Sequence, residues 1–235
     1  FHAVVFSEEV SLITCEWAPF FASTLENNGF VAELFTESFE QVDYDSSVTF
    51  TNWPGAMRQA KATTADALLG AYYSEERAKH FLFSKPVYSV ESVFIARRDS
   101  GVLYNGTLRN LEPFCVGISK GYTYSKGFDQ AEFLTKVEAD DPEALVAMIL
   151  DGRVDVIIIQ VEKFMEIMRS TSPGQVNMLT ALGPSLTKKG LFLAVSKDHP
   201  NASELVCHFN EGLGRLIQSG RYAEIIKQKN GDHLP

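Results

Sequence analysis

The stretch that decides the fold is ALLGAYYSEERAKHFLFSKPVY, residues 67–88. Its apolar start, residues 67–69, predicts the end of a buried strand, and Gly70 permits either a tight turn or a close approach to a ligand. Ser74 is a typical N-cap of a short helix whose first turn holds two glutamates. Arg77 is electrostatically misplaced in that turn, because the N-terminal end of a helix favours negative charge.

Two explanations of Arg77 remain open on local chemistry alone. In the first, a bound anion is held by the free backbone N–H groups of the helix start together with the guanidinium. In the second, Arg77 is paired with Glu75, Glu76 or another acid on the surface.

The stretch resembles a signature of the bacterial extracellular solute-binding proteins of family 3, which are the periplasmic amino-acid receptors of ABC importers. That signature is G-x-T-x-T-x-x-R-x-x-x-x-x-F-S-x-P-x-Y, and residues 70–88 follow most of it. The resemblance implies that Arg77 grips the α-carboxylate of the ligand. Ser74 takes the place of the second Thr, whereas Tyr72 stands where the family has a Thr or Ser that also bonds the carboxylate. Residues 210–225 are similar to the terminal family pattern N-x-G-L-x-x-L-x-x-x-G-R-Y-x-x-I, so the resemblance covers essentially the whole chain.

The composition bounds the class of protein. The chain has 235 residues, 45% hydrophobic and 22% charged, which suits one large domain or two small ones. A formal net charge of −9 and the lack of a Lys/Arg cluster argue against binding to nucleic acid. No run approaches the ~18 apolar residues of a membrane span. The chain opens on Phe1 without the leader of a signal peptide, so it is either processed or trimmed, which is compatible with a periplasmic protein.

Cysteines and histidines predict neither a disulfide framework nor a metal site. Cys15, Cys115 and Cys207 have no C-x-x-C spacing, so we expect them to behave as small buried hydrophobes. The five histidines are scattered along the chain, with no pair four residues apart and no cysteine at a metal-ligand spacing. We therefore expect no metal and no cofactor.

Strands and helices alternate along the chain, with an interruption in the middle. The expected strands are residues 10–15, 48–51, 67–69, 86–98, 115–119, 154–159, 176–179 and 189–195. The expected helices begin near residues 30, 53, 75, 128, 142, 161, 200 and 222, and the one near 128 is expected to run to 137.

Strict alternation in residues 86–98 suits a ribbon that crosses between two lobes, and residues 189–195 are expected to cross back. The predicted fold class is α/β, with two Rossmann-like lobes joined by two hinge strands, the type II periplasmic binding protein that the resemblance implies. Lobe 1 is expected to comprise residues 1–97 and 190–235, and lobe 2 residues 98–189.

Candidate ligand-binding residues follow four predicted strands, because open α/β sheets bind ligands beyond the carboxyl ends of their strands. These residues are Glu16 and Trp17, then Gly70 to Tyr72, then Ser119 to Tyr122, and finally Gln160. If the lobes face each other, the four loops converge on one cleft.

The resemblance implies a role for several of these positions. Trp17 begins a family-like aromatic–x–Pro–aromatic segment and packs on the ligand side chain, although a tryptophan that caps the core would give the same pattern. Trp53 opens a W-x-x-x-x-R stretch that lines the cleft. Three residues of the loop after the first strand of lobe 2 donate further hydrogen bonds to the carboxylate: Gly121, Tyr122 and Thr123.

Gln160 is the main departure from the family, which has an Asp there that pairs with the α-ammonium of the ligand. A Gln supplies no charge, and the loss of a desolvated ionic partner costs ~2–5 kcal/mol. Either Glu16 replaces the missing acid, or the ligand lacks an ammonium group.

The sequence thus predicts a periplasmic receptor, not an enzyme, for a small carboxylate-bearing solute such as an amino acid. Its partners are expected to be that ligand and the membrane permease of an ABC importer, with no nucleic acid, and the protein is expected to be a monomer.

Three alternatives stay open. Residues 117–121 match the G-x-S-x-G pattern of serine hydrolases, with Asp155 and His208 in the matching order, but no strong helix start follows directly. The chain also resembles cyclohexadienyl dehydratases, in which case Glu16 is the obvious proton donor. A ligand-sensing domain of a membrane receptor would have the same sequence features.

Overall fold

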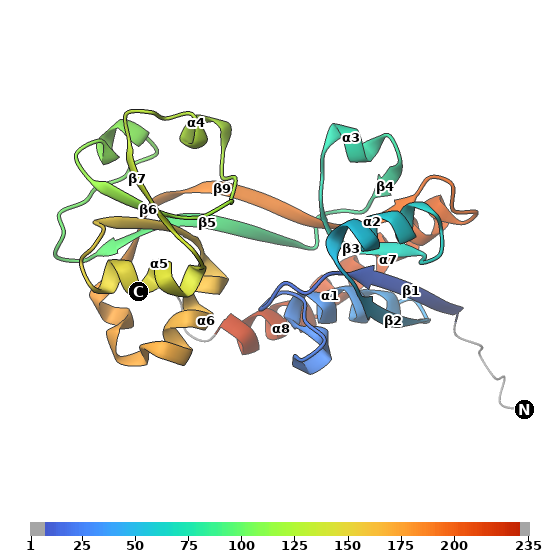
Figure 1. Ribbon diagram of the computed structural model, residues 1–235. Helices are drawn as coiled ribbons and strands as arrows, with labels where there is room; N and C mark the ends of the chain where they lie inside the picture. The colour runs from blue at the N-terminus through green and yellow to red at the C-terminus, as the bar shows by residue number, and fades with distance from the viewer. Residues whose placement is uncertain (1–7, 231–235) are drawn as a thin grey trace, which may run out of the picture. The chain divides into compact units, whose positions relative to one another are not determined.

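The computed structural model describes residues 8–230, whose helices and strands are drawn in Figure 1. These residues form two compact units. Unit 1 comprises residues 8–89 and 190–230, and unit 2 comprises residues 90–189. The expected lobe boundaries at 97/98 and 189/190 stay a prediction. They mark hinges between lobes, and a hinge is defined by how the lobes move and not by how compact each unit is.

Unit 1 is built on three parallel strands, β1 (Glu8–Thr14), β2 (Tyr44–Phe50) and β3 (Ala67–Tyr72). Their order in the sheet is β2-β1-β3. The end of the long strand β9 (Leu179–Ser196) pairs antiparallel with β3, and the short β4 (Phe81–Phe83) pairs antiparallel with β9.

Both faces of this sheet are covered by helices (Figure 1). The helices of unit 1 are α1 (Phe30–Glu40), α2 (Trp53–Lys61), α3 (Glu75–Ala78), α7 (Ala202–Gln218) and α8 (Arg221–Asn230). Helix α2 packs on the face that carries Ile13 and Leu68. Helices α1 and α7 pack together through the ring of Phe209, whose centroid lies 5.5 Å from that of Phe35 and 5.0 Å from that of Phe39.

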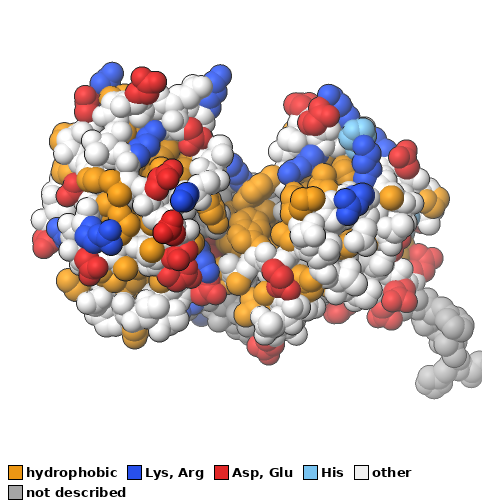
Figure 2. All heavy atoms as spheres, viewed as in Figure 1, with side chains coloured by type: hydrophobic (Ala, Val, Ile, Leu, Met, Phe, Trp, Pro, Cys, Tyr) orange, Lys and Arg blue, Asp and Glu red, His pale blue; other side chains and the backbone are white. Residues whose placement is uncertain are grey.

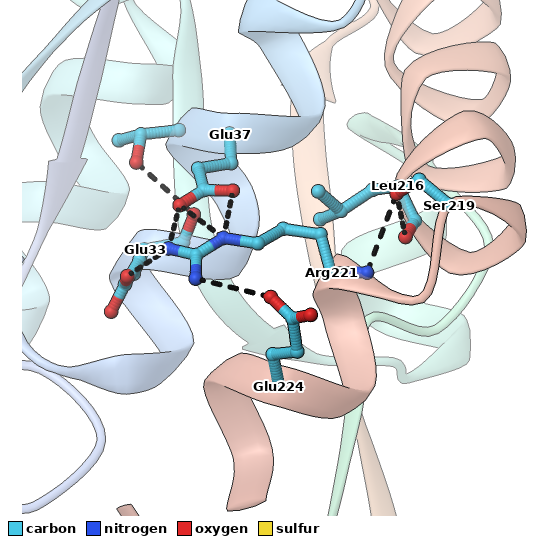
Figure 3. Close-up of polar contacts among 7 residues, drawn as sticks. Glu33, Glu37, Leu216, Ser219, Arg221 and Glu224 are labelled. Atoms are coloured by element: carbon cyan, nitrogen blue, oxygen red, sulfur yellow. Dashed lines mark hydrogen bonds and ion pairs between the residues drawn. The ribbon is translucent and has the colours of Figure 1, made fainter. Parts of the chain in front are cut away.

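The start of α8 is attached to α1 by one arginine, as Figure 3 shows. Arg221 Nη2 lies 2.6 Å from Oε1 of Glu37 and 3.0 Å from Oε1 of Glu33. Its Nη1 lies 3.6 Å from Oε2 of Glu224. The Glu33 side chain is only 6% exposed, so its charge depends on this cation for compensation.

Unit 2 is built on β5 (Tyr88–Arg97, from residue 90 on), β6 (Cys115–Ser119), β7 (Thr135–Ala139) and β8 (Val156–Gln160). Their order is β5-β8-β6-β7, with β6 parallel to both β7 and β8, and β5 antiparallel to β8. The helices are α4 (Lys126–Asp129), α5 (Pro142–Leu150) and α6 (Val161–Thr171).

The apolar run of β8 is explained by burial on both faces. Ile157 and Ile159 pack into one core cluster with α5 and α6, whereas Ile158 packs into a second cluster with Phe94 and Phe128. A strand buried on both sides has no polar face, so its sequence is continuously hydrophobic.

Three expected elements are wrong. Residues 128–137 form only the end of the short α4 and then the edge strand β7, whose register with β6 includes Gly117 opposite Val137. Residues 176–179 are not a separate strand, because a 3-10 helix (Pro173–Met178) precedes β9, which starts at Leu179. Strand β3 does not end at residue 69 but continues through Gly70 to Tyr72.

The cysteines are free, and two of them are half-buried. Cys207 is exposed on α7, so the expectation of burial is wrong for that residue. Within residues 8–230 no group of three His, Cys, Asp or Glu side chains is placed to hold a metal ion. None of the described helices is both long and apolar enough to cross a membrane.

The surface around α5 and α6 mixes charges of both signs, as Figure 2 shows. Lys163, for example, lies 3.4 Å from Glu143 and 3.0 Å from Glu166. This face therefore differs from the basic patch that nucleic-acid binding requires.

Candidate functional site

Both units contain the same switch in strand order. In unit 1 the chain passes from β1 to β2 on one side and then to β3 on the other. In unit 2 it passes from β6 to β7 and then to β8 on the other side. Ligands of open α/β sheets bind beyond the carboxyl ends of the strands at such a switch point. Each unit therefore presents a candidate binding edge of its own, here named the unit 1 edge (the segments that follow β1, β2 and β3) and the unit 2 edge (those that follow β6, β7 and β8).

Aromatic rings dominate the unit 1 edge. The ring of Trp17, after β1, lies 5.9 Å from that of Tyr72, at the end of β3, in an edge-to-face arrangement of 76°. Trp17 also packs on the buried Phe20 at 4.7 Å. Since Trp17 and Tyr72 are both partly exposed, they combine a contact with the core and a surface available to a ligand.

Arg77, on α3, contacts the end of β3 and the ring of Trp53. The Ser74 side chain caps α3 and accepts a 3.2 Å hydrogen bond from the Arg77 backbone N–H, as the sequence predicts. Arg77 Nη1 donates a 2.7 Å hydrogen bond to the carbonyl oxygen of Tyr72, and its Cζ lies 5.4 Å from the ring centroid of Trp53. This half-buried guanidinium is partly desolvated, which lowers the pKa of Arg77 from its ordinary value.

Arg77 forms no ion pair with any residue in the described part of the chain. The two adjacent acids have other partners, because Glu75 Oε1 accepts a hydrogen bond from Tyr73 and Glu76 pairs with Lys79. Of the two explanations left open by the sequence, pairing with a neighbouring acid is therefore wrong. A half-buried cation without a counter-ion favours the other explanation, a bound anion.

Trp53 is placed beside Arg77 by the start of α2. Asn52 caps this helix by accepting a 2.9 Å hydrogen bond from the Gly55 N–H, and Pro54 occupies the first turn, where its missing N–H is harmless. Trp53 is therefore the first residue of α2. The guanidinium of Arg77 lies over its indole ring.

Gly70 is required by packing within the unit. Its φ is +71°, and a Cβ there would lie 2.5 Å from two ring atoms of Phe21. The pairing of β3 with β9 shifts register between Leu68 and Ala71, so Gly70 lies at an irregularity of the strand. A direct contact of Gly70 with a ligand stays a prediction.

Glu16 directs its carboxylate into its own loop. Oε2 accepts a 3.0 Å hydrogen bond from the Ser23 N–H, and Oε1 accepts a 2.6 Å bond from the Ser23 hydroxyl. Both oxygens therefore have a structural role.

The unit 2 edge is formed by the loop after β6 and the end of β8. Gly121 has a φ of +75° and open space around it, so the chain turns there without steric hindrance. The next residue, Tyr122, is 51% exposed, and its ring lies 6.2 Å from that of Tyr124, tilted by 31°. Thr123 is exposed as well.

The sequence did not single out Tyr124, which fixes this loop. Tyr124 is buried, its hydroxyl accepts a 2.9 Å hydrogen bond from the Ser119 N–H, and burial raises the pKa of the phenol. The sequence carries no signal for this difference, because residues two apart in an extended segment share a face, whereas Tyr122 is exposed and Tyr124 is buried.

Gln160 ends β8 and stands at the N-cap position of α6. It is half-buried, and its side chain makes no capping hydrogen bond. The amide is uncharged, so this position offers hydrogen bonds without an ionic partner.

The serine-hydrolase interpretation is not supported by the geometry. Ser119 is buried at 6% exposure, and the Asp155 carboxylate accepts a 2.8 Å hydrogen bond from the Cys115 N–H. His208 Nδ1 lies 2.9 Å from the Tyr44 hydroxyl. Asp155 and His208 thus have other partners within their own units.

A sequence model of one family, described as bacterial extracellular solute-binding proteins, family 3, matches residues 12–231. Among curated proteins, none matches the chain significantly.

Several solved structures are similar over nearly the whole chain. The second substrate-binding domain of GlnP from Lactococcus lactis, in its open conformation, is 15% identical with a TM-score of 0.78, covering 96% of this chain and 97% of that one. The second substrate-binding domain of a putative amino acid ABC transporter from Streptococcus pneumoniae is 20% identical with a TM-score of 0.75, covering 94% and 100%. A histidine kinase sensor domain is 21% identical with a TM-score of 0.66, covering 97% and 99%. These similarities confirm the predicted α/β fold of the type II periplasmic binding proteins.

Proposed function

The chain belongs to the bacterial extracellular solute-binding proteins of family 3, and we propose that it is a receptor for a small carboxylate-bearing solute, an amino acid or a related organic acid. The observation that carries this proposal is the half-buried guanidinium of Arg77, which has no counter-ion among the described residues. A ligand carboxylate would supply the missing charge.

The hydrogen bonds of Arg77 support a carboxylate as the bound group. Within residues 8–230 only Nη1 of its guanidinium has a hydrogen-bond partner, the Tyr72 carbonyl oxygen. Nη2 and Nε remain available for a bidentate pair, the geometry that makes Arg–carboxylate recognition strong and directional. Trp17, Tyr72 and Trp53 would then contact the body of the ligand.

The unit 2 edge, taken by itself, is proposed as a second ligand-contacting surface. Gly121 and Thr123 lie in an open loop whose backbone is free to approach an anion, and Tyr122 presents an exposed ring. Gln160 would add a neutral hydrogen-bonding amide.

The proposed biological partner is the membrane permease of an ABC importer, with the protein acting as a monomer in the periplasm. The similarity to the substrate-binding domain of a putative amino acid ABC transporter supports this context, while the similarity to a histidine kinase sensor domain supports a sensing role as the second candidate. Uptake of a radiolabelled ligand by cells with and without the protein separates the importer role from the sensing role. Uptake should require the protein if it serves an importer and should not require it if it serves a sensor.

An enzymatic role on the same fold has less support. A dehydratase needs a proton donor at the unit 1 edge, and both carboxylate oxygens of Glu16 already accept hydrogen bonds from Ser23.

Replacement of Arg77 by Ala tests the receptor function. We expect Arg77→Ala to abolish the stabilisation that a panel of amino acids and organic acids gives in a thermal-shift assay, while the melting temperature of the ligand-free protein changes little. For the unsubstituted protein, a hundredfold excess of ligand over its dissociation constant stabilises by about 2.7 kcal/mol. Arg153→Ala, an exposed arginine shortly before the amino end of β8, is the matched control and should keep the response. An unchanged response in Arg77→Ala would refute the proposal.

A further inference from the structure

We propose that Asn105 is a site of spontaneous deamidation, in which the backbone nitrogen of Gly106 attacks the side-chain amide and water completes the reaction. This inference is independent of the receptor function proposed above and concerns unit 2 alone. It follows from the contrast between two Asn–Gly pairs that the structure places in different surroundings.

The reaction converts the Asn105 amide into an acid by way of a cyclic imide. The Gly106 nitrogen forms a bond to Cγ of Asn105, and the bond between Cγ and Nδ2 then breaks. Nδ2 leaves as ammonia, with the proton of the Gly106 N–H as its third hydrogen. Water opens the five-membered ring at one of its two carbonyls, which gives aspartate or isoaspartate. Glycine favours the first step because it has no side chain to shield its nitrogen.

The attacking nitrogen is accessible at Asn105. Asn105, Gly106 and Thr107 are all exposed, in the loop that precedes the 3-10 helix Leu108–Leu111. In the described part of the chain the Gly106 N–H donates no hydrogen bond. A Cβ at Gly106 would have only Pro184 within 4 Å, with its Cγ at 3.4 Å. The Gly106 nitrogen can therefore approach the Asn105 side chain without breaking a backbone hydrogen bond of its own.

The side-chain carbonyl oxygen of Asn105 is held between two donors. Oδ1 accepts a 3.2 Å hydrogen bond from the Thr107 N–H and a 3.0 Å bond from Nδ2 of Asn110. During the attack this oxygen becomes an oxyanion, which accepts stronger hydrogen bonds than a neutral amide oxygen does. The two donors therefore stabilise the transition state more than the ground state, in the manner of an oxyanion hole.

The second pair, Asn28–Gly29, is held by its surroundings. Gly29 is buried, and its N–H donates a 3.0 Å hydrogen bond to the carbonyl oxygen of Glu26. The carbonyl oxygen of Asn28 accepts a 2.9 Å bond from the Ala22 N–H. A Cβ at Gly29 would lie 2.5 Å from the carbonyl oxygen of Phe20, so the backbone has no room to shift. Attack at this pair requires the turn to open first, which makes the reaction slower.

Deamidation at Asn105 would alter a loop that packs on β9 within unit 2. Tyr104 is buried in the same core cluster as Leu182, and a Cβ at Gly183 would overlap the Tyr104 carbonyl. Isoaspartate inserts a side-chain carbon into the main chain, and either product adds a negative charge to a formal net charge of −9. We therefore expect the converted protein to elute later in anion exchange and to show faster amide hydrogen exchange in residues 101–107.

Peptide mapping by mass spectrometry measures the conversion at each Asn–Gly pair while the purified protein is incubated at mildly alkaline pH. In the folded protein we expect Asn105 to convert roughly tenfold or more faster than Asn28. In concentrated urea both pairs lose their surroundings, so their rates should agree within roughly threefold. Asn230–Gly231 is followed as a separate peptide, because Gly231 lies outside the described residues.

A variant tests the two donors to the carbonyl oxygen. We expect Asn110→Ala, which removes the Nδ2 donor to Asn105 Oδ1, to slow the conversion of Asn105 by roughly 2- to 10-fold in the folded protein. Asn177→Ala, an exposed asparagine elsewhere in unit 2, is the matched control and should leave the rate unchanged.

Equal conversion of Asn105 and Asn28 in the folded protein overturns the proposal, and this comparison needs no variant. A difference between the two pairs that is just as large in urea overturns it as well, because the flanking sequence and not the structure would then set the rates. An unchanged rate in Asn110→Ala overturns the role given to the donors of the carbonyl oxygen.

Discussion

The guanidinium of Arg77 is tied to the carbonyl oxygen of Tyr72 by a 2.7 Å hydrogen bond from Nη1, five residues back along the chain. This bond turns the end of β3 and the start of α3 into one rigid support for the cation. Trp53 contacts the guanidinium from a different helix, with Cζ 5.4 Å from the centre of its ring. Two elements therefore orient the same side chain before any ligand arrives, which reduces the entropy lost on binding.

Trp53 should act as a positioning residue for Arg77. Because a cation–π contact of this kind is worth about 0.5–2 kcal/mol, we expect Trp53→Leu to weaken carboxylate binding by roughly 3- to 30-fold. Trp53→Phe keeps an aromatic face and should recover part of the loss. Calorimetric titration with the tightest carboxylate of the thermal-shift panel measures the change, and equal affinities of the Leu and Phe variants would contradict the role.

The sequence predicted the parts of the fold that have strong local signals. Ser74, the expected N-cap, and Asp141, at the start of the helix expected near residue 142, both accept capping hydrogen bonds, because capping is decided by a few adjacent residues. Arg77 was identified as out of place in a helix start, and its lack of an ionic partner among residues 8–230 agrees with that interpretation.

The failures come from contacts distant in sequence. Residues 135–139 have no helical or strand signal of their own strong enough to decide, and their pairing with β6 makes them a strand. Gly70 suggested a turn, but the ring of Phe21, far from it in sequence, fills the space where a Cβ would lie. The engagement of Glu16 by Ser23 is likewise invisible without coordinates.

Arg221 should hold α8 in place. Removal of its side chain leaves the buried carboxylate of Glu33 uncompensated beside Glu37, an arrangement that strongly disfavours the docked helix. We expect Arg221→Ala to lower the melting temperature and to increase amide hydrogen exchange in residues 221–230. Lys79→Ala, which breaks an exposed pair with Glu76, is the control and should change neither measurement appreciably. Normal protection of α8 in Arg221→Ala would show that the helix docks without this cation.

Asp66 should make the protein less stable in acid. Although burial opposes it, hydrogen bonds from Ser11 and His199 lower the pKa of the Asp66 carboxyl below its ordinary value of 3.8. Because the folded pKa lies below the unfolded one, the stabilisation is present at neutral pH and is lost as the pH falls from about 5 through the folded pKa. Melting temperatures measured from pH 7 to pH 3 should fall less steeply for Asp66→Asn than for the unsubstituted protein. Asp43→Asn, at an exposed loop position, should keep the original slope.

Gly70 should be intolerant of even one methyl group. An alanine there must adopt a φ of +71° and place its Cβ 2.5 Å from the Phe21 ring, so we expect Gly70→Ala to lose roughly 2–4 kcal/mol in urea unfolding. Gly214→Ala, in α7 with no atom within 4 Å of the added Cβ, is the matched control and should be neutral or slightly stabilising.

The steric contribution to the loss of stability in Gly70→Ala is separable from the backbone contribution by adding Phe21→Leu. This second change makes room for the methyl group but leaves φ unchanged. If the clash matters, the double variant should be more stable than the sum of the two single changes by roughly 1 kcal/mol or more. Strict additivity would instead assign the whole effect to the backbone, and the packing of Phe21 on Gly70 would then not explain the glycine.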